Sequence, residues 1–112
     1  MGNAIDTKVK RLAFKMYLKP GCKDEYKKRH AALWPQMKDV LKASGVGNYS
    51  IYLDEDTNTL FAYQEVTDGQ GSQDLGNNLI VQKWWDYMSD LMEVNPDNSP
   101  ISVPLGNMFH LE

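Results

Sequence analysis

A histidine occupies an apolar position in the stretch EYKKRHAALWPQM, which runs from Glu25 to Met37. The helical spacing of the neighbouring apolar residues calls for a leucine where the chain has His30. Tyr26 lies four residues earlier, so a phenol and an imidazole share one helical face and can converge on a small polar ligand. The structural alternative is that His30 is a hydrogen-bonded residue at the core edge and Tyr26 a packing residue.

The position of His30 in its helix bears on its charge. Pro35 cannot donate to a helical ladder, so the helix is predicted to stop or kink near Ala31, which leaves His30 in the last turn. There the imidazole meets the negative end of the helix dipole, which stabilises imidazolium. The sequence therefore predicts a histidine that is protonated near neutral pH and acts as an acid.

Three aromatic residues elsewhere in the chain are candidate ligand contacts. Trp84 and Trp85 are adjacent on a predicted helix and point about 100° apart, so they cannot fill the same core position. Aromatic rings beside a polar pocket suit sugars, whose C–H faces stack on rings while their hydroxyls form hydrogen bonds. Tyr49 begins a predicted strand and can direct its phenol into such a pocket. The alternative for all three is core or interface packing.

Several classes of chemistry lack the residues they need. Cys22 is the only cysteine, which excludes an intrachain disulfide and zinc sites built on paired cysteines. The two histidines, His30 and His110, are far apart in sequence and give a metal site little support. Neither a glycine-rich phosphate loop nor a nucleophile motif is present, so phosphoryl and acyl transfer are not expected.

Charge and hydropathy limit the partners. The net charge of −3, with few clustered basic residues, disfavours nucleic acid. No apolar run approaches the roughly 20 residues that span a bilayer, and the N-terminal MGNAIDTK lacks the apolar core of a signal peptide. The sequence therefore predicts a cytoplasmic protein that binds neither nucleic acid nor membrane.

The 112 residues predict a single α+β domain over 9–112, after an N-terminal extension of residues 1–8 that we expect to be flexible. Alternating apolar residues, turn residues and i, i+4 charge pairs locate the elements. The order β-α-β-β-α-β is typical of a ferredoxin-like sandwich. Strands are expected at 10–18, 45–54, 59–66 and within 104–111, and helices at 23–31, from Pro35 to Ser44, and at 79–92.

The hairpin strands at 45–54 and 59–66 carry apolar residues on both faces. Helices can cover one face of an antiparallel sheet, and a sheet from another subunit is the simplest cover for the other. The polar segment 67–78 is predicted to be a mobile loop, and NPDNSP, residues 95–100, to be a turn.

Five stretches together resemble the L-rhamnose mutarotase family: EYKKRHAALWP, GNYSIYLD, LFAY, QKWWDYMSDLM and NPDNSP. The resemblance runs from about Arg11 to Leu111. It implies a homodimeric α+β barrel without a cofactor that binds L-rhamnose or a related deoxysugar such as L-fucose. It also implies that His30 is the proton donor and that the sugar is contacted by Tyr26, Tyr49, Trp84 and Trp85.

The implied reaction interconverts the α and β anomers of a free sugar by ring opening to the aldehyde and reclosure. The ring oxygen must gain a proton while the anomeric hydroxyl loses one, so an acid with a pKa near neutrality is useful. Asp97, Asp86 and a bound water remain unranked candidates for the proton acceptor. The loop DGQGSQDLGNN is more polar than the helical segment expected before the tryptophan pair, which leaves the sugar's identity open.

Other functions fit the same fold. A dimeric α+β barrel can be a cofactor-free monooxygenase or a small-ligand-binding module without catalysis, and a purely structural dimerisation domain is a third alternative. A monooxygenase predicts an apolar pocket and activity on electron-rich aromatics. A mutarotase predicts sugar binding that depends on His30, Tyr26 and Tyr49.

Overall fold

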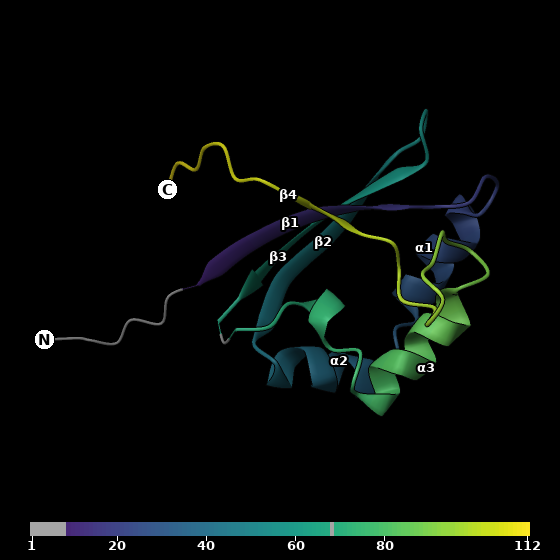
Figure 1. Ribbon diagram of the computed structural model, residues 1–112, viewed down its shortest axis with the longest axis horizontal. Coiled ribbons are helices and arrows are strands. Elements are labelled where there is room, and N and C mark those ends of the chain that lie inside the picture. The colour runs from purple at the N-terminus through teal and green to yellow at the C-terminus, as the bar shows by residue number, and fades with distance from the viewer. Residues whose placement is uncertain (1–8, 68) are drawn as a thin grey trace, which may run out of the picture.

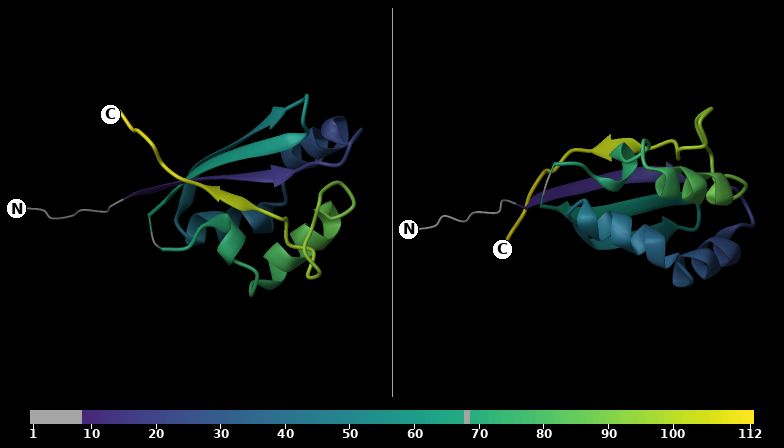
Figure 2. Two further views of the ribbon diagram at one scale, coloured as in Figure 1. Left: turned by 45° about the horizontal axis from the view of Figure 1, so that its top comes forward. Right: turned by 90° about the horizontal axis from the view of Figure 1, so that it is seen from below.

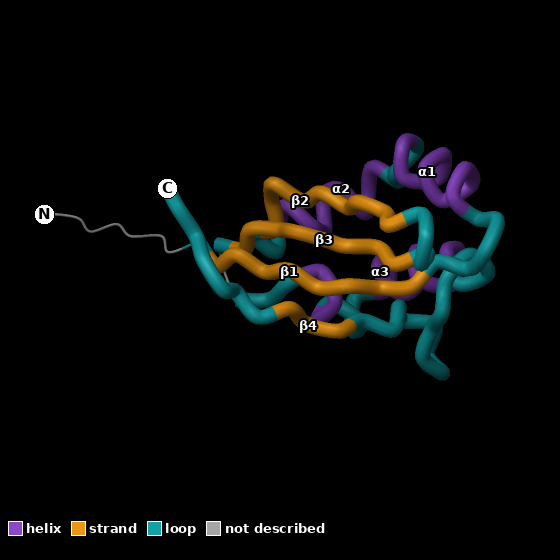
Figure 3. The backbone as a smooth tube through the Cα atoms, turned by 90° about the horizontal axis from the view of Figure 1, so that it is seen from above, coloured by secondary structure: helices purple, strands orange, loops and turns teal. Residues whose placement is uncertain are grey.

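The computed structural model describes residues 9–67 and 69–112, so the predicted N-terminal extension lies outside the described residues. Figure 1 shows the four strands of one antiparallel sheet, whose order is β2-β3-β1-β4. The helices lie in front of the strands in Figure 2 (right) and behind them in Figure 3, which views the sheet from the opposite side. This is the predicted ferredoxin-like α+β arrangement.

Strand β1 (Lys10–Tyr17) pairs with β3 (Thr59–Val66) along its whole length. Strand β2 (Val46–Asp54) forms the predicted hairpin with β3. The register of this hairpin shifts between Gly47 and Ser50, where Asn48 has a φ of 43°. Such a bulge places extra residues on one strand and redirects their side chains.

Helices α1 (Lys23–Ala31) and α2 (Pro35–Ala43) are separated where the proline predicts a break. Trp34 is extended, with φ −59° and ψ 135°, because the ring of the following proline disfavours the α region. Pro35 then occupies the start of α2, where its missing N–H costs no helical bond. The prediction of two helical pieces is confirmed.

Helix α3 (Leu79–Met88) is shorter than the predicted 79–92. Leu91 and Met92 continue the apolar spacing and are buried, but their backbone pairs with the two residues that follow β1. The N–H of Lys19 donates to the carbonyl of Leu91 at 2.8 Å, and Met92 forms a bridge with Leu18. Periodicity thus identified buried residues correctly and the end of the helix wrongly.

The last strand, β4 (Val103–Leu105), begins one residue before the predicted segment and is much shorter. It pairs with β1 from Ala13 to Lys15. Residues 106–112 then leave the sheet, although Met108, Phe109 and Leu111 give them a strand-like composition.

The polar segment predicted to be a mobile loop has a defined position along most of its length. It contains a short 3₁₀ helix, η1 (Ser72–Asp74), in which Ser72 is buried, and Leu75 joins the core. Asn78 then caps α3 by accepting from the backbone N–H groups of Ile80 and Val81 at 2.9 and 3.3 Å. Hydrogen bonds to buried partners hold this segment despite its glycine-rich composition.

The two faces of the sheet differ in cover. The face toward the helices carries the core, including Phe14, Met16 and Leu60. On the other face Tyr52 and Phe61 are 71% and 40% exposed. Among the described residues, no helix has the length and apolar character that crossing a membrane requires.

Candidate active site

One cavity of about 820 Å³ lies between the inner face of the sheet and helices α1 and α3. Its lining comes from strands, helices and the η1 segment, so folding brings distant parts of the chain together. All five residues that the sequence singled out line it: Tyr26, His30, Tyr49, Trp84 and Trp85. Their roles toward a ligand stay predictions.

His30 is held by its own helix. Its Nδ1 lies 3.1 Å from the backbone carbonyl oxygen of Tyr26, which is one turn earlier in α1. A carbonyl only accepts, so this bond places a hydrogen on Nδ1 and leaves Nε2 for a ligand. The centroid of the His30 ring lies 4.3 Å from that of the Tyr26 ring and 5.5 Å from that of Trp84, to which it is nearly perpendicular.

The predicted charge state of His30 is wrong in direction. Burial lowers the pKa of His30 from its ordinary value of 6.5, because removal from water penalises the imidazolium. The bond to the Tyr26 carbonyl raises the pKa, but by less than burial lowers it. Desolvation therefore favours the neutral imidazole near pH 7, where the position of His30 in its helix predicted imidazolium.

The two tyrosines of the cavity remain protonated. Burial raises the pKa of Tyr26, and the nearby Tyr49 phenol adds to this increase. Burial also raises the pKa of Tyr49, while a hydrogen bond from Ser72 opposes the shift. Both side chains thus offer neutral hydroxyl groups that can donate and accept hydrogen bonds.

Trp84 and Trp85 are both buried, and they take different directions as their adjacency predicts. Trp84 packs edge-to-face against Trp34, with ring centroids 5.0 Å apart, and against His30. Trp85 lies beside Gly76, where an added Cβ would come within 3.1 Å of its Cζ3 atom. Each indole therefore packs in the core and also lines the cavity.

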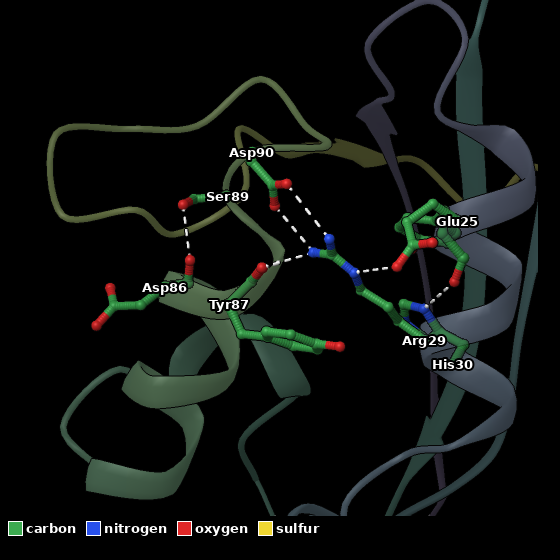
Figure 4. Close-up of polar contacts among 8 residues, drawn as sticks. Glu25, Arg29, His30, Asp86, Tyr87, Ser89 and Asp90 are labelled. Carbon is green, nitrogen blue, oxygen red and sulfur yellow. Dashed lines mark hydrogen bonds and ion pairs between the residues drawn. The ribbon is translucent and has the colours of Figure 1, made fainter.

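Four further residues contribute to the site or its support. Ser72 and Gln73 line the cavity, and the fully buried Gln64 bonds to Ser72 from below. Gln64 carried a readable signal, because it interrupts the apolar alternation of β3. Arg29 bridges α1 to the end of α3, as Figure 4 shows.

The suggested proton acceptors on side chains lie outside the cavity lining. Asp86 on α3 accepts from Gln82 and from Asn98. Asp97 accepts from the backbone of Ser99 within the predicted turn. The carboxylates that do line the cavity are Asp24 and Glu55, and Glu55 pairs with Lys23 at 2.8 Å. In the described part of the chain, no group of three potential metal ligands is gathered.

Comparisons with known proteins agree with one another. A family model described as L-rhamnose mutarotase matches residues 11–111. An L-rhamnose mutarotase of Bacteroides thetaiotaomicron is 64% identical over 93% of this chain and 100% of its own length. One from Listeria monocytogenes is 54% identical over 92% of this chain and 99% of its own. The crystal structure of L-rhamnose mutarotase from Formosa agariphila superposes with a TM-score of 0.86 at 57% identity, covering 92% of this chain and 99% of that one.

Proposed function

Because this chain belongs to the L-rhamnose mutarotase family, we propose that it is an enzyme that interconverts the α and β anomers of L-rhamnose. One observation carries the proposal: a single cavity holds an imidazole, two neutral phenols and two indoles. This is the isomerase function that the sequence resemblance implied, and the proposed reaction uses no cofactor.

The cavity suits a six-membered sugar ring on chemical grounds. Its volume of about 820 Å³ is of the size that holds small ligands. The indole rings of Trp84 and Trp85 offer surfaces for the C–H faces of the sugar. The hydroxyls of Tyr26 and Tyr49 and the Nε2 atom of His30 offer hydrogen bonds to its oxygens.

In this proposal His30 carries the proton in ring opening. The neutral Nε2 takes the proton of the anomeric hydroxyl as the bond between C1 and the ring oxygen breaks. The imidazolium then gives that proton to the ring oxygen, which has received the electrons of the broken bond. C1 becomes an aldehyde carbon, one proton has moved between two sugar oxygens, and His30 is neutral again.

Closure on the other face completes the exchange. Rotation about the C1–C2 bond presents the opposite face of the aldehyde to the new hydroxyl, and the same proton transfers run in reverse. His30 thus remains the proton donor that the resemblance implied, and it also serves as the acceptor. Asp86 and Asp97 are not needed, in agreement with their positions outside the cavity lining.

Anomer exchange of L-rhamnose measured by NMR saturation transfer tests the function. We expect the wild type to accelerate exchange relative to a protein-free sample at the same pH. His30→Ala should reduce that acceleration by a factor of about 10² to 10⁴. His110→Ala is the matched control, because His110 is exposed and outside the cavity lining. A wild type that accelerates neither L-rhamnose nor L-fucose would sink the proposal.

A homodimer is the second part of the proposal. One row across the outer face of the sheet runs from Tyr52 through Phe61 and Lys15 to Val103. All but the lysine are large apolar residues with exposed side chains. An apolar sheet face of this kind needs cover, and a second copy of the same sheet can provide it.

The C-terminal segment also supports a second subunit. Residues 106–112 pass one end of the open face (Figure 3), and Glu112 lies 3.6 Å from Arg11 of β1. Met108, Phe109 and Leu111 are among the most exposed apolar side chains of the described residues. Burial against a partner would remove this surface from water.

The cellular location belongs to the proposal as well. We place the enzyme in the cytoplasm, where free thiols stay reduced, and Cys22 is the chain's only cysteine. Neither nucleic acid nor a membrane is part of the proposed function.

A further inference from the structure

Gln64 is a polar residue in an apolar row. It lies on the inner face of β3 between Ala62 and Val66, and its side chain is 0% exposed. A buried amide is retained at such a position only when its donors and acceptor find partners. The identity of those partners shows what the residue does.

Both ends of the Gln64 amide bind Ser72. The Oε1 atom accepts from the Ser72 backbone N–H at 2.8 Å, and Nε2 donates to the Ser72 hydroxyl oxygen at 2.8 Å. A backbone N–H can only donate, so the orientation of the Gln64 amide is fixed. These two bonds dock η1 onto the sheet.

The hydroxyl of Ser72 connects the Gln64 amide to the Tyr49 hydroxyl. Its oxygen accepts from Gln64 Nε2 and from Gln73 Nε2, the latter at 3.3 Å. Its own hydrogen is then free to donate to the Tyr49 hydroxyl oxygen, 3.4 Å away. With that oxygen accepting from Ser72, the Tyr49 hydrogen points elsewhere, and Tyr49 lines the cavity.

Backbone geometry brings these groups together from two sides. The bulge in β2 pairs Gly47 with Glu65 and Ser50 with Tyr63, so Asn48 and Tyr49 together stand opposite Gln64. From the loop side, a Cβ on Gly71 would lie 2.8 Å from Gln64 Oε1 and 2.9 Å from Leu12 Cδ1. Only glycine lets the loop approach this closely.

We propose that Gln64 and Ser72 are positioning residues that dock η1, whose Ser72 and Gln73 line the cavity, and orient the Tyr49 hydroxyl as a hydrogen-bond donor toward a sugar oxygen. The sugar part rests on the proposed function. With His30 Nε2 accepting and Tyr49 donating, the cavity offers complementary partners to the two oxygens on C1. The polar segment thereby gains the role that the sequence left open.

The orientation of the Tyr49 hydroxyl can be tested without sugar, by measuring the titration of Tyr49. Protein labelled with 3-fluorotyrosine gives ¹⁹F signals for its six tyrosines, and Tyr49→Phe assigns the signal of Tyr49. We expect Ser72→Ala to raise the titration midpoint of Tyr49, because the phenolate loses its donor. Ser72→Thr keeps the hydroxyl and should keep the wild-type midpoint. Ser89→Ala is the control, since its hydroxyl donates to the Asp86 carbonyl outside the cavity lining.

The same variants are then compared for anomer exchange of L-rhamnose. We expect Ser72→Ala to lower kcat/KM about tenfold, the scale of one hydrogen bond, while Ser72→Thr stays close to wild type. An unchanged Tyr49 midpoint or an unchanged kcat/KM in folded Ser72→Ala would overturn the inference. If the wild type proves inactive on L-rhamnose, the proposed function fails, and the ¹⁹F titration alone still decides whether Ser72 orients Tyr49.

Gly71→Ala is an independent variant that retains the side chains of Gln64, Ser72 and Tyr49. The added methyl group displaces Gln64 or the loop, so the Ser72 backbone N–H should exchange with solvent faster than in the wild type. Gly47→Ala is the control, because a Cβ there meets no atom within 4 Å. Equal protection of the Ser72 N–H in Gly71→Ala and the wild type would contradict the docking of the loop by Gln64.

Discussion

At the scale of single residues, the Tyr26 carbonyl decides which nitrogen of His30 can meet a substrate. It holds Nδ1 at 3.1 Å and leaves Nε2 of this cavity-lining residue free of that bond. Burial lowers the pKa of His30, so the resting imidazole is a base at Nε2 and becomes an acid only after it takes a proton. Ring opening needs both steps in that order when it begins at the anomeric hydroxyl.

This order predicts how the rate depends on pH. The profile of kcat/KM reports the free enzyme, in which the neutral form of His30 is the active one. As pH falls through the lowered pKa of His30, imidazolium accumulates. The value of kcat/KM should then fall with the slope expected for a single titrating proton. Above the ordinary histidine value of 6.5 the profile should be flat through neutral pH.

Saturation transfer across this range measures the profile, with protein-free samples correcting for exchange catalysed by solvent. An NMR titration of the His30 ring protons should give the same midpoint as the rate. A kcat/KM that instead declines as pH rises toward 7 would mean that the free enzyme needs imidazolium, as the helix dipole alone predicted.

Residue types and spacing, together with the family resemblance, identified five side chains that line the cavity, but not what orients them. Tyr26 and His30 follow from the i, i+4 rule, because their contact is local to one helix. Gln64 and Ser72 could not be paired from sequence, since their contact depends on a close approach at Gly71. The charge of His30 was missed for a similar reason: desolvation depends on the packing of other elements around it.

At the scale of elements, Arg29 joins α1 to the end of α3 (Figure 4). Its guanidinium donates to the Tyr87 carbonyl at 2.7 Å, to Asp90 at 2.9 Å and to Glu25 at 2.8 Å. Its Cζ also lies 4.5 Å from the centroid of the Tyr87 ring. His30 follows Arg29 in α1 and Trp84 lies on α3, so this junction sets the distance between two walls of the cavity.

We therefore expect Arg29→Ala to lower the free energy of unfolding by about 1 to 3 kcal/mol, because it removes several bonds and leaves the Tyr87 carbonyl without its donor. Arg29→Lys should recover only part of this loss, since an ammonium cannot replace the planar fork. Urea denaturation measures both, with the exposed Lys28→Ala as control. An Arg29→Ala protein as stable as the control would show that the junction contributes nothing to the fold.

Element boundaries were predictable from the sequence where local residues determine them. Pro35 and the i, i+4 charge pair of Glu25 and Arg29 act locally, and the helices they mark end where the sequence indicates. The end of α3 was not predictable, because Met92 fits a helical stripe equally well and is removed from it by its bridge to Leu18. Nonlocal backbone pairing, which periodicity does not record, made the difference.

At the scale of the whole molecule, the sheet has one face covered by helices and one without cover from the described chain. The sequence showed this as apolar residues on both sides of the hairpin strands, and the structure assigns each to a face. The inner set forms the core around Leu60 and Ala62, while Tyr52 and Phe61 remain on the outer face. What covers the outer face is the question that the proposed dimer answers.

A charge at the centre of that face should separate the subunits. Phe61 pairs with Tyr52 on one side and with Lys15 on the other, so Phe61→Lys places two cations directly opposite each other in an interface that must exclude water. We expect light scattering after size-exclusion chromatography to give a dimer mass for the wild type and a monomer mass for Phe61→Lys. Leu79→Lys is the matched control, because Leu79 is 68% exposed at the start of α3 and away from the sheet. It should remain a dimer. A wild type of monomer mass would remove the proposed cover, and a dimeric Phe61→Lys would place the interface on another surface.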